Sequence, residues 1–554
     1  MNKIFLLGLL FFTTHIQAQL TESTTVDVQL KFVKNNGKVD AMVNLQYPVA
    51  SNNSIQIGNL RDSYGTPSIG KFMTELEGKA GTKVSKVTKG DSIVITPAGK
   101  EVNLSYTLSF DSAALADFTY APNTGSDHIH FAFCQWMLPL IDRNKSLAYD
   151  IRVNELPGNW IGYSSLSANP KKIQVKGSMS EIFSAIVGAG IFYKKTFVVR
   201  GKPLSVFING KFDVGHEKLA KMAYQTVSYQ HSLFNDFRFD FYNVVLLPKP
   251  GNIAGISIPN MFLCHLKRDV EYGRLAWLMS HEMQHRWIGN TIALKDTTAS
   301  RLRHQWFKEG INDYLAYVAL LASKSFTKDE FVNGINEYLK NIKENPYAAA
   351  SADSIEKLAT LGKYGVVATK LAYYKGGLIG LIADKEFVKQ TKSGVYSGIK
   401  DMMVQLVKNK SSQQERIELD DSIFFTMADS MQLPLQALYR KHIVDGSDDF
   451  DLPATLFNNA YTLKKTNYHV YDLGLSYVDR NGKLFATSVL PEGPAYKAGI
   501  RNDMEIVSTT SVNRFSNAWC DCPVILRVKT GGVEKTISYL PRGKTTEVLQ
   551  YVKN

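Results

Sequence analysis

The spacing of apolar residues changes near Gly215, and this change limits the folds that the chain can adopt. Before it, runs such as VDVQLKFV and VNLSYTLSF alternate apolar with polar residues and are separated by Asn, Gly and Pro clusters. Alternation with a period of two is typical of half-buried strands, and such clusters are typical of turns. Residues 20–210 are therefore predicted to form an N-terminal antiparallel β domain of the sandwich type.

From Gly215 to about Val444 the apolar pattern is mostly helical. It predicts a strand over FDFYNVVLLPKP, ended by Pro248 and Pro250, and helices over HEKLAKMAYQTVSYQHSLF, EGINDYLAYVALLAS, TKDEFVNGINEYLKNIK and PLQALYRKHIV. A linker over 446–467 then leads to a strand-rich segment. We predict a multidomain α+β chain with a mostly helical domain over 211–455 and a small β domain over 466–546.

The first 19 residues, MNKIFLLGLLFFTTHIQAQ, contain one lysine, a short apolar run and a small, polar end. This pattern predicts a cleaved secretory signal, since a membrane-spanning helix needs about 20 apolar residues. An uncleaved N-terminal anchor is the alternative. We expect a mature chain without a transmembrane helix, exported to the periplasm or the extracellular space.

Composition excludes other classes of protein. Four cysteines in 554 residues are too few for a disulfide-built scaffold, and Cys520 and Cys522 lie too close together for a zinc ribbon without a second pair. The net charge of +13 is spread along the chain without an arginine-rich block, so no nucleic-acid partner is expected.

The stretch HEMQHRWIGN, residues 281–290, predicts a metal site. In a helix, His281 and His285 lie on one face, and Glu282 lies beside them. Two neutral imidazoles suit one Zn²⁺ per chain, and the adjacent carboxylate can take a proton from the attacking water. The alternative is a pair of ordinary histidines. Downstream, RLRHQWFKEGINDYLAYV offers His304 and Glu309 as a third ligand.

These residues resemble the thermolysin-like gluzincins, in which a second helix supplies a glutamate ligand. HRWIGN resembles the aminopeptidase-N-type family, and KEGINDYLAY resembles the helix that this family shares with the glycyl-aminopeptidase type. The resemblance implies that Glu309 rather than His304 binds the metal and that Asp313 orients a ligand histidine. It also implies a thermolysin-like catalytic domain over 211–455. The interval of 24 positions from His285 to Glu309 exceeds the aminopeptidase-N-type spacing, which keeps His304 open.

The run ATKLAYYKGGLIGLIADKEF extends this resemblance. In the resembled families, the tyrosine of Tyr-x-Lys-Gly donates a hydrogen bond to the oxyanion, and Tyr373 has that place here. The alternative is that Tyr373 and Tyr374 only pack within a helix.

Aminopeptidases of this group carry a glutamate for the substrate's amine on a strand before the zinc helix. The matching stretch here is GNIAGISIPNMFL, with Ser257 in the place of that glutamate. A serine cannot pair with an ammonium group as a carboxylate does. Gly255 and Ser257 are predicted to bind substrate through main-chain pairing, and aminopeptidase and endopeptidase activity both stay open.

The last segment resembles a PDZ domain of the bacterial protease-associated type. The resemblance rests on YDLGLSYV and VLPEGPAYKAGIRNDMEIVSTTSV, and it implies that Leu473, Gly474 and Leu475 hold a C-terminal peptide. An unrelated small β domain is the alternative.

The sequence thus predicts a secreted zinc metallopeptidase that acts on peptides or proteins, with His281, His285 and Glu309 as ligands, Glu282 as general base and Tyr373 as oxyanion donor. The alternative is a catalytically inactive protein that binds peptides through the same groove and the PDZ domain.

Overall fold

The computed structural model forms two compact units, which we call unit 1 (Met1–Tyr272) and unit 2 (Gly273–Asn554). The predicted signal at 1–19, Pro250, Cys520 and Cys522 lie outside the described residues. The structure describes residues 25–35, 38–49, 53–57, 69, 72–86, 93–109, 123–138, 145–248, 254–295, 302–359, 367–391, 397–409, 416–480, 483–509 and 523–554.

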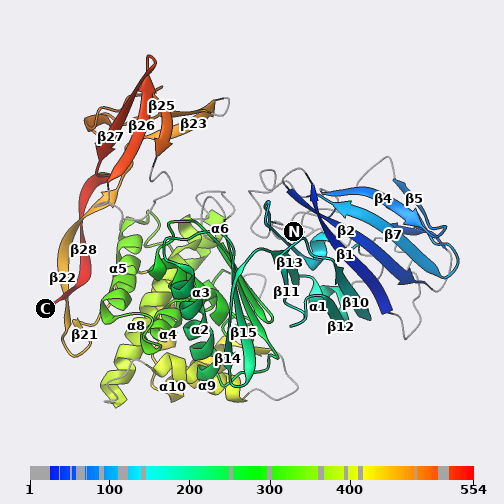
Figure 1. Cartoon of the computed structure of the whole chain (residues 1–554). Coiled ribbons are helices and arrows are strands. Elements are labelled where there is room, and N and C mark those ends of the chain that lie inside the picture. The colour runs from blue at the N-terminus through cyan, green and yellow to red at the C-terminus, as the bar shows by residue number, and fades with distance from the viewer. Residues whose placement is uncertain are drawn as a thin grey trace, which may run out of the picture. The chain divides into compact units, whose positions relative to one another are not determined.

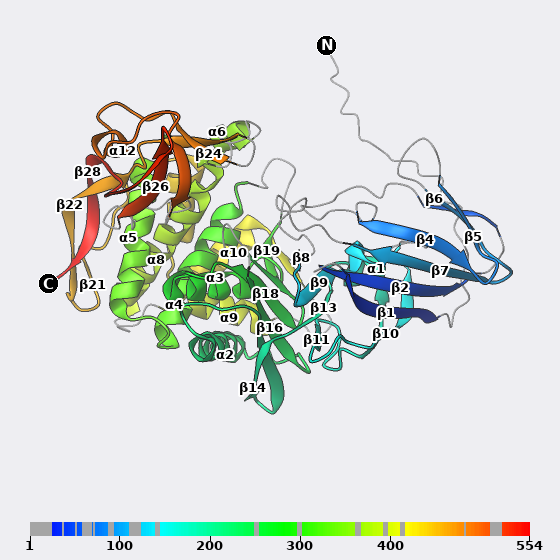
Figure 2. The ribbon, with the colours of Figure 1, turned by 45° about the horizontal axis from the view of Figure 1, so that its top comes forward.

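The largest sheet of unit 1 has the period of two that its sequence predicts. In strand β1, for example, every second residue from Val26 to Phe32 is buried. Figure 2 shows β1, β2, β7 and β4 side by side in this sheet. In spatial order, its strands are β12 (Lys172–Ser178), β10 (Ser146–Asn154), β1 (Thr25–Asn35), β2 (Lys38–Pro48), β7 (Glu101–Leu108) and β4 (Met73–Lys79).

The prediction of a purely antiparallel domain is wrong for one pair of strands. β1 and β10 run parallel, with Thr25 opposite Ala148, whereas the other neighbours in this sheet are antiparallel. A parallel pair needs a long connection, and here more than a hundred residues separate the two strands. Alternation of apolar residues reveals the strands but not their direction.

Two smaller sheets and two short helices complete the N-terminal part of unit 1. The strand orders are β3 (Ile55–Ile57), β6 (Ile93–Thr96), β5 (Lys83–Lys86) in one sheet and β11 (Ile161–Ser164), β13 (Ile186–Gly190), β9 (His128–Ala132), β8 (Asn123–Thr124) in the other; the helices are η2 (Phe133–Gln135) and α1 (Met179–Ile182).

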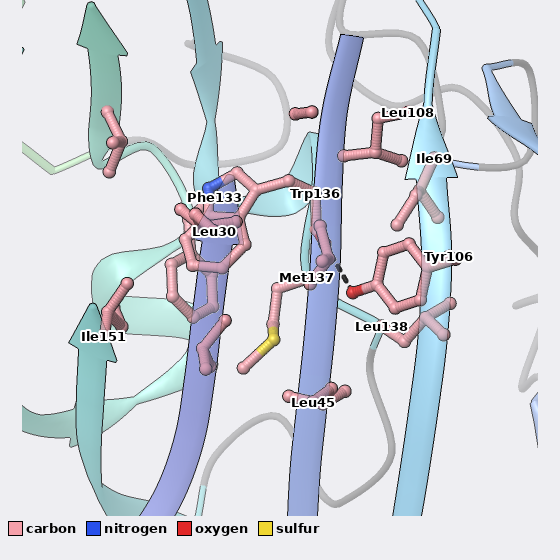
Figure 3. Packing of buried hydrophobic residues seen from close by; sticks show 14 of the residues in the cluster. Leu30, Leu45, Ile69, Tyr106, Leu108, Phe133, Trp136, Met137, Leu138 and Ile151 are labelled. Carbon is pink, nitrogen blue, oxygen red and sulfur yellow. Dashed lines mark hydrogen bonds between the residues drawn. The ribbon is translucent and has the colours of Figure 1, made fainter. Parts of the chain in front are cut away.

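The core of this region is aliphatic and aromatic. Leu30, Leu45 and Ile151 from the large sheet pack with Phe133 and Trp136, which lie after β9 (Figure 3). The one polar group that Figure 3 shows bonded there is the Tyr106 hydroxyl, which donates to the Trp136 carbonyl oxygen at 2.7 Å. This bond satisfies a hydroxyl that would otherwise be costly to bury.

A mixed sheet follows in unit 1, with β15, β16 and β18 parallel and β14 and β17 antiparallel at its edges. The predicted helix at HEKLAKMAYQTVSYQHSLF is α2 (His216–Leu233), which connects two parallel strands. In order the strands are β14 (Tyr193–Val199), β15 (Lys202–Ile208), β16 (Tyr242–Pro248), β18 (Met261–Leu266) and β17 (Ala254–Ile258). β16 is the strand predicted at FDFYNVVLLPKP.

Unit 2 is largely helical up to position 444. Among the described helices, none combines the length and the apolar composition needed to cross a bilayer. The elements are α3 (Tyr272–Gln284), β19 (Ile292–Leu294), the π-helical turn η3 (Trp306–Ile311), α4 (Asn312–Ala322), α5 (Lys328–Glu344), α6 (Ala352–Ala359), α8 (Leu371–Thr391), α9 (Gly398–Asn409), β20 (Ile417–Leu419), α10 (Asp421–Ser430), α11 (Leu435–Tyr439) and the π-helical turn η4 (Arg440–Val444).

The C-terminal part of unit 2 is a long two-stranded ribbon and a separate small sheet. The ribbon pairs β22 (Tyr461–Tyr471) with β28 (Arg542–Lys553), extended by β21 (Thr455–Leu456), and Figure 1 shows it beside α5. The predicted linker at 446–467 is therefore wrong from Tyr461 onward, because its partner strand lies some 80 residues later. The small sheet contains β23 (Ser476–Arg480), β24 (Lys483–Thr487), β25 (Glu505–Thr509), β26 (Val524–Thr530) and β27 (Val533–Tyr539), with α12 (Pro494–Lys497) between β24 and β25.

Candidate metal centre

Helix α3 carries the first histidine of the predicted site, and the second follows just past its end. His281 is buried on the last turn of α3, and His285 is the first residue after Gln284. The backbone still brings the two rings together, with centroids 4.7 Å apart. His285 Nδ1 lies 3.2 Å from the Ile288 carbonyl oxygen, so its Nε2 is the nitrogen that turns toward His281.

Three donor atoms converge at this point. The Nε2 atoms of His281 and His285 lie 3.1 Å apart, and each lies 3.4 Å from Glu309 Oε2. A tetrahedral ion with bonds of about 2.0–2.1 Å separates its ligand atoms by about 3.3 Å. Two imidazole nitrogens and one carboxylate oxygen at this spacing fit Zn²⁺ in its usual catalytic ligand set, which leaves one position open.

The structure separates the two candidates for the third donor. Glu309 joins the histidines, and the three residues form the metal-capable group found in the described chain. The Nε2 atom of His304 instead lies 3.1 Å from Asp421 Oδ1 at the start of α10.

Two residues at the start of α4 hold His281 in place. Asp313 Oδ1 lies 2.6 Å from His281 Nδ1, and the Asn312 side chain donates to the His281 carbonyl oxygen at 2.9 Å. Burial alone lowers the pKa of His281, but the charge and hydrogen bond of Asp313 and a hydrogen bond of Glu309 outweigh it and raise that pKa to about 10. With Nδ1 held by Asp313, Nε2 is the nitrogen that faces Glu309 and His285, and it would bind a metal ion after losing its proton.

The two glutamates of the site titrate in opposite directions. Burial raises the pKa of Glu282, although the neighbouring histidines oppose the shift. Burial also disfavours the charge on Glu309, but its hydrogen bonds with His281 and His285 outweigh this and hold its pKa well below the usual range. Glu309 is thus a permanent anion, whereas Glu282 is better suited to exchange a proton.

Tyr373 lies next to this cluster. Its ring stacks near His281 at 6.3 Å between centroids and 19° between planes. Burial, followed by the charge and a hydrogen bond of Glu309, raises the pKa of its hydroxyl, which stays protonated and able to donate.

Two glycines at the crossing of η3 and α8 hold Tyr373 and Glu309 together. A Cβ atom on Gly310 would lie 2.6 Å from Gly376 Cα, and one on Gly376 would lie 2.3 Å from the Trp306 carbonyl oxygen. No side chain fits between η3 and α8 at this crossing. The adjacent runs Lys-Glu-Gly and Lys-Gly-Gly were the available signal, since close backbone approach is one reason for glycine in a helix.

Lys375, also on α8, anchors this helix to the segment around the end of η4. Its buried ammonium group donates to the carbonyl oxygens of His442, Gly446 and Ser447 at 3.0, 2.8 and 3.3 Å. These bonds satisfy carbonyl groups in and just after the last turn of η4. Burial lowers the pKa of Lys375 to about 8.

The comparisons with known proteins agree with this geometry. Residues 274–379 match the M61 glycyl aminopeptidase family. The matched segment contains all three donor residues, Glu282 and Tyr373. No curated protein matches the chain.

The fold also has solved relatives. An aminopeptidase N family protein from Idiomarina loihiensis superimposes with a TM-score of 0.65 at 13% identity, over 96% of this chain and 98% of that one. An M1 zinc metallopeptidase from Deinococcus radiodurans gives a TM-score of 0.44 at 12% identity, over 78% of this chain and 94% of that one. The family match supports a peptidase, and the likeness to the Idiomarina loihiensis protein shows a shared fold.

The predicted substrate residues lie in the other unit. Gly255 and Ser257 are on β17, the edge strand of the mixed sheet in unit 1, opposite Cys264 and Phe262 of β18. The cluster lies in unit 2, so its geometry does not test their role.

The predicted peptide-binding loop of the C-terminal segment has a defined conformation. Gly474 has a φ of +72°, and a Cβ atom there would lie 2.8 Å from the Ala495 nitrogen, so this position requires glycine. The Asp472 carboxylate accepts from the Gly474 N–H, and Leu473 and Leu475 pack on the small core of this sheet. The loop leads into β23, an edge strand.

Proposed function

We propose that this chain is a secreted zinc metallopeptidase that hydrolyses peptide bonds. The observation that carries the proposal is the spacing of His281, His285 and Glu309, which suits a tetrahedral ion with one open position. The match of the surrounding segment to a glycyl aminopeptidase family supports the same reaction.

A zinc ion held by these residues would polarise the scissile carbonyl and lower the pKa of water at the open position. Glu282 then accepts a proton from the attacking water and delivers it to the leaving amine. Burial raises the pKa of Glu282, which makes it a stronger proton acceptor than an exposed glutamate.

Tyr373 stabilises the charge that develops on the carbonyl oxygen of the scissile bond. Its protonated hydroxyl donates to the carbonyl oxygen as negative charge develops there, which lowers the energy of the transition state more than that of bound substrate. Asp313 keeps the donor nitrogen of His281 in place.

The name of the matched family favours aminopeptidase activity. In that case an acidic residue elsewhere in the chain must recognise the amine, because the hydroxyl of Ser257 pairs weakly with an ammonium group. We assign the chemistry to a thermolysin-like domain over 211–455. The segment 466–546 is proposed as a PDZ-like module that binds a C-terminal peptide at Leu473, Gly474 and Leu475.

The test is mass spectrometry of a peptide pool, half with free and half with acetylated N termini, incubated with and without a zinc chelator. Chelator-sensitive cleavage of the free half alone establishes an aminopeptidase. Chelator-sensitive internal cleavage of the acetylated half establishes an endopeptidase. Binding of peptides without any cleavage would overturn the proposal in favour of an inactive peptide-binding protein.

A further inference from the structure

Two exposed cations lie beside the aromatic rings that contact His281. The Lys370 ammonium group is 4.1 Å from the centroid of the Tyr373 ring, and the Arg274 guanidinium is 4.2 Å from that of Trp277. The Trp277 ring in turn lies 5.5 Å from the His281 ring. Each cation is thus one aromatic ring away from the candidate metal centre.

Neither cation is neutralised within the part of the chain that the structure describes. Lys370 and Arg274 have no carboxylate within ion-pair distance there, although other exposed cations of unit 2, such as Lys553 with Asp329, form such pairs. An exposed cation held over a ring keeps its outer side available to an anion.

Apart from Glu282, the proposed general base, the carboxylates near the centre have partners. Asp313 contacts His281, and Glu309 contacts both histidines. Glu337, whose charge reaches Tyr374 and Tyr317, is paired with Lys340 at 3.3 Å. Beside the reacting groups, the described part of unit 2 therefore offers positive rather than negative charge to a substrate.

Given the proposed function, on which this inference rests, we propose that Lys370, assisted by Arg274, selects peptides that carry a carboxylate within one or two residues of the scissile bond. The carboxylate belongs either to an acidic side chain or to the C terminus of a short peptide.

The length of an extended substrate peptide is consistent with this separation. An extended peptide advances about 3.4 Å per residue, so one or two residues separate a carbonyl beside the Tyr373 hydroxyl from a carboxylate beyond the Tyr373 ring. A charge-assisted contact contributes enough to change kcat/KM by about tenfold.

The experiment uses a parent peptide whose cleaved bond has been located and two matched pairs derived from it. One pair has Asp or Asn immediately after the scissile bond, within an amidated chain. The other pair ends one residue after the scissile bond, as a free carboxylate or as an amide. The full chain is compared with Lys370→Met, Lys370→Arg and Lys389→Met, and zinc content is measured for each variant.

Lys389 provides the matched control, because it is an exposed lysine near the C-terminal end of α8, about 28 Å along the helix axis from Lys370, which directly precedes α8. We expect the full chain, Lys370→Arg and Lys389→Met to prefer the carboxylate member of at least one pair by about tenfold. Lys370→Met should reduce that ratio to about one, and the pair affected identifies the source of the carboxylate.

Equal kcat/KM values within both pairs for the full chain would overturn the inference but not the proposed function, provided that cleavage still requires Glu282. A preference that survives in Lys370→Met would overturn the assignment to Lys370. Cleavage no faster than that by Glu282→Gln would overturn the proposed function itself.

Discussion

At the scale of single residues, the metal site depends on the carboxylate that contacts His281. Asp313 touches the nitrogen that does not face the other donors, and an Asn there would lose the charge that orients and polarises the ring. We predict that Asp313→Asn weakens zinc binding by about 10–100-fold, measured by competition with a chromophoric chelator.

Asp421→Asn is the matched control, because Asp421 forms the same kind of contact with His304. It should leave zinc affinity unchanged. Equal losses in the two variants would mean that His304 contributes to the metal site and that the assignment of Glu309 is incomplete.

The donor set illustrates what a sequence can and cannot decide at this scale. The i, i+4 spacing of His281 and His285 predicts a shared face from helix geometry alone. The choice between His304 and Glu309 needed either the family resemblance or the fold, because Asp421, the partner of His304, lies 117 positions away in sequence.

At the scale of elements, the crossing of η3 and α8 controls the distance between Glu309 and Tyr373. An alanine normally stabilises a helix by up to about 1 kcal/mol relative to glycine. At Gly310, however, the added carbon would meet backbone atoms at 2.5 and 2.6 Å. We predict that Gly310→Ala lowers the free energy of unfolding by about 1–3 kcal/mol and lowers kcat by about a hundredfold.

Gly273→Ala is the control for this prediction, because the nearest atom to a Cβ at Gly273 on α3 is 3.9 Å away. It should be neutral or slightly stabilising in urea unfolding. If Gly310→Ala behaved in the same way and kept its activity, the close crossing would not position the site.

The sequence predicts a helix over EGINDYLAYVALLAS, and most of that helix is α4. The preceding widened turn, η3, is not predictable from apolar spacing, because one extra residue per turn leaves the pattern of the following helix intact. Its position at Glu309 agrees with the tendency of such turns to occur at functional sites.

At the scale of the whole molecule, the C-terminal ribbon is tied to the helices of unit 2. The Asn336 side chain on α5 donates to the Tyr551 carbonyl oxygen at 3.0 Å and accepts from the Tyr551 N–H at 2.8 Å. Removing it leaves two buried backbone groups without these partners. We predict that Asn336→Ala lowers the free energy of unfolding of the full chain by about 2–4 kcal/mol, measured by urea denaturation.

Asn341→Ala, on the same helix, removes only a bond to the carbonyl oxygen of Glu337 one turn back, and it should cost less than about 0.5 kcal/mol. A loss for Asn336→Ala as small as that for Asn341→Ala would show that the contact with the ribbon contributes little to stability. The strands of the ribbon are predictable from alternation, but the contact of Asn336 with Tyr551 spans 215 positions and has no local signal.

The most direct test of the central claim measures zinc content and peptide hydrolysis in the same preparations of the full chain and of Glu282→Gln. We predict about one zinc per chain in both proteins and a loss of kcat/KM of at least about a thousandfold in the variant. Glu282 is not among the three converging donors, so its loss should spare the metal. Unchanged hydrolysis in Glu282→Gln, or zinc absent from the full chain, would contradict the account.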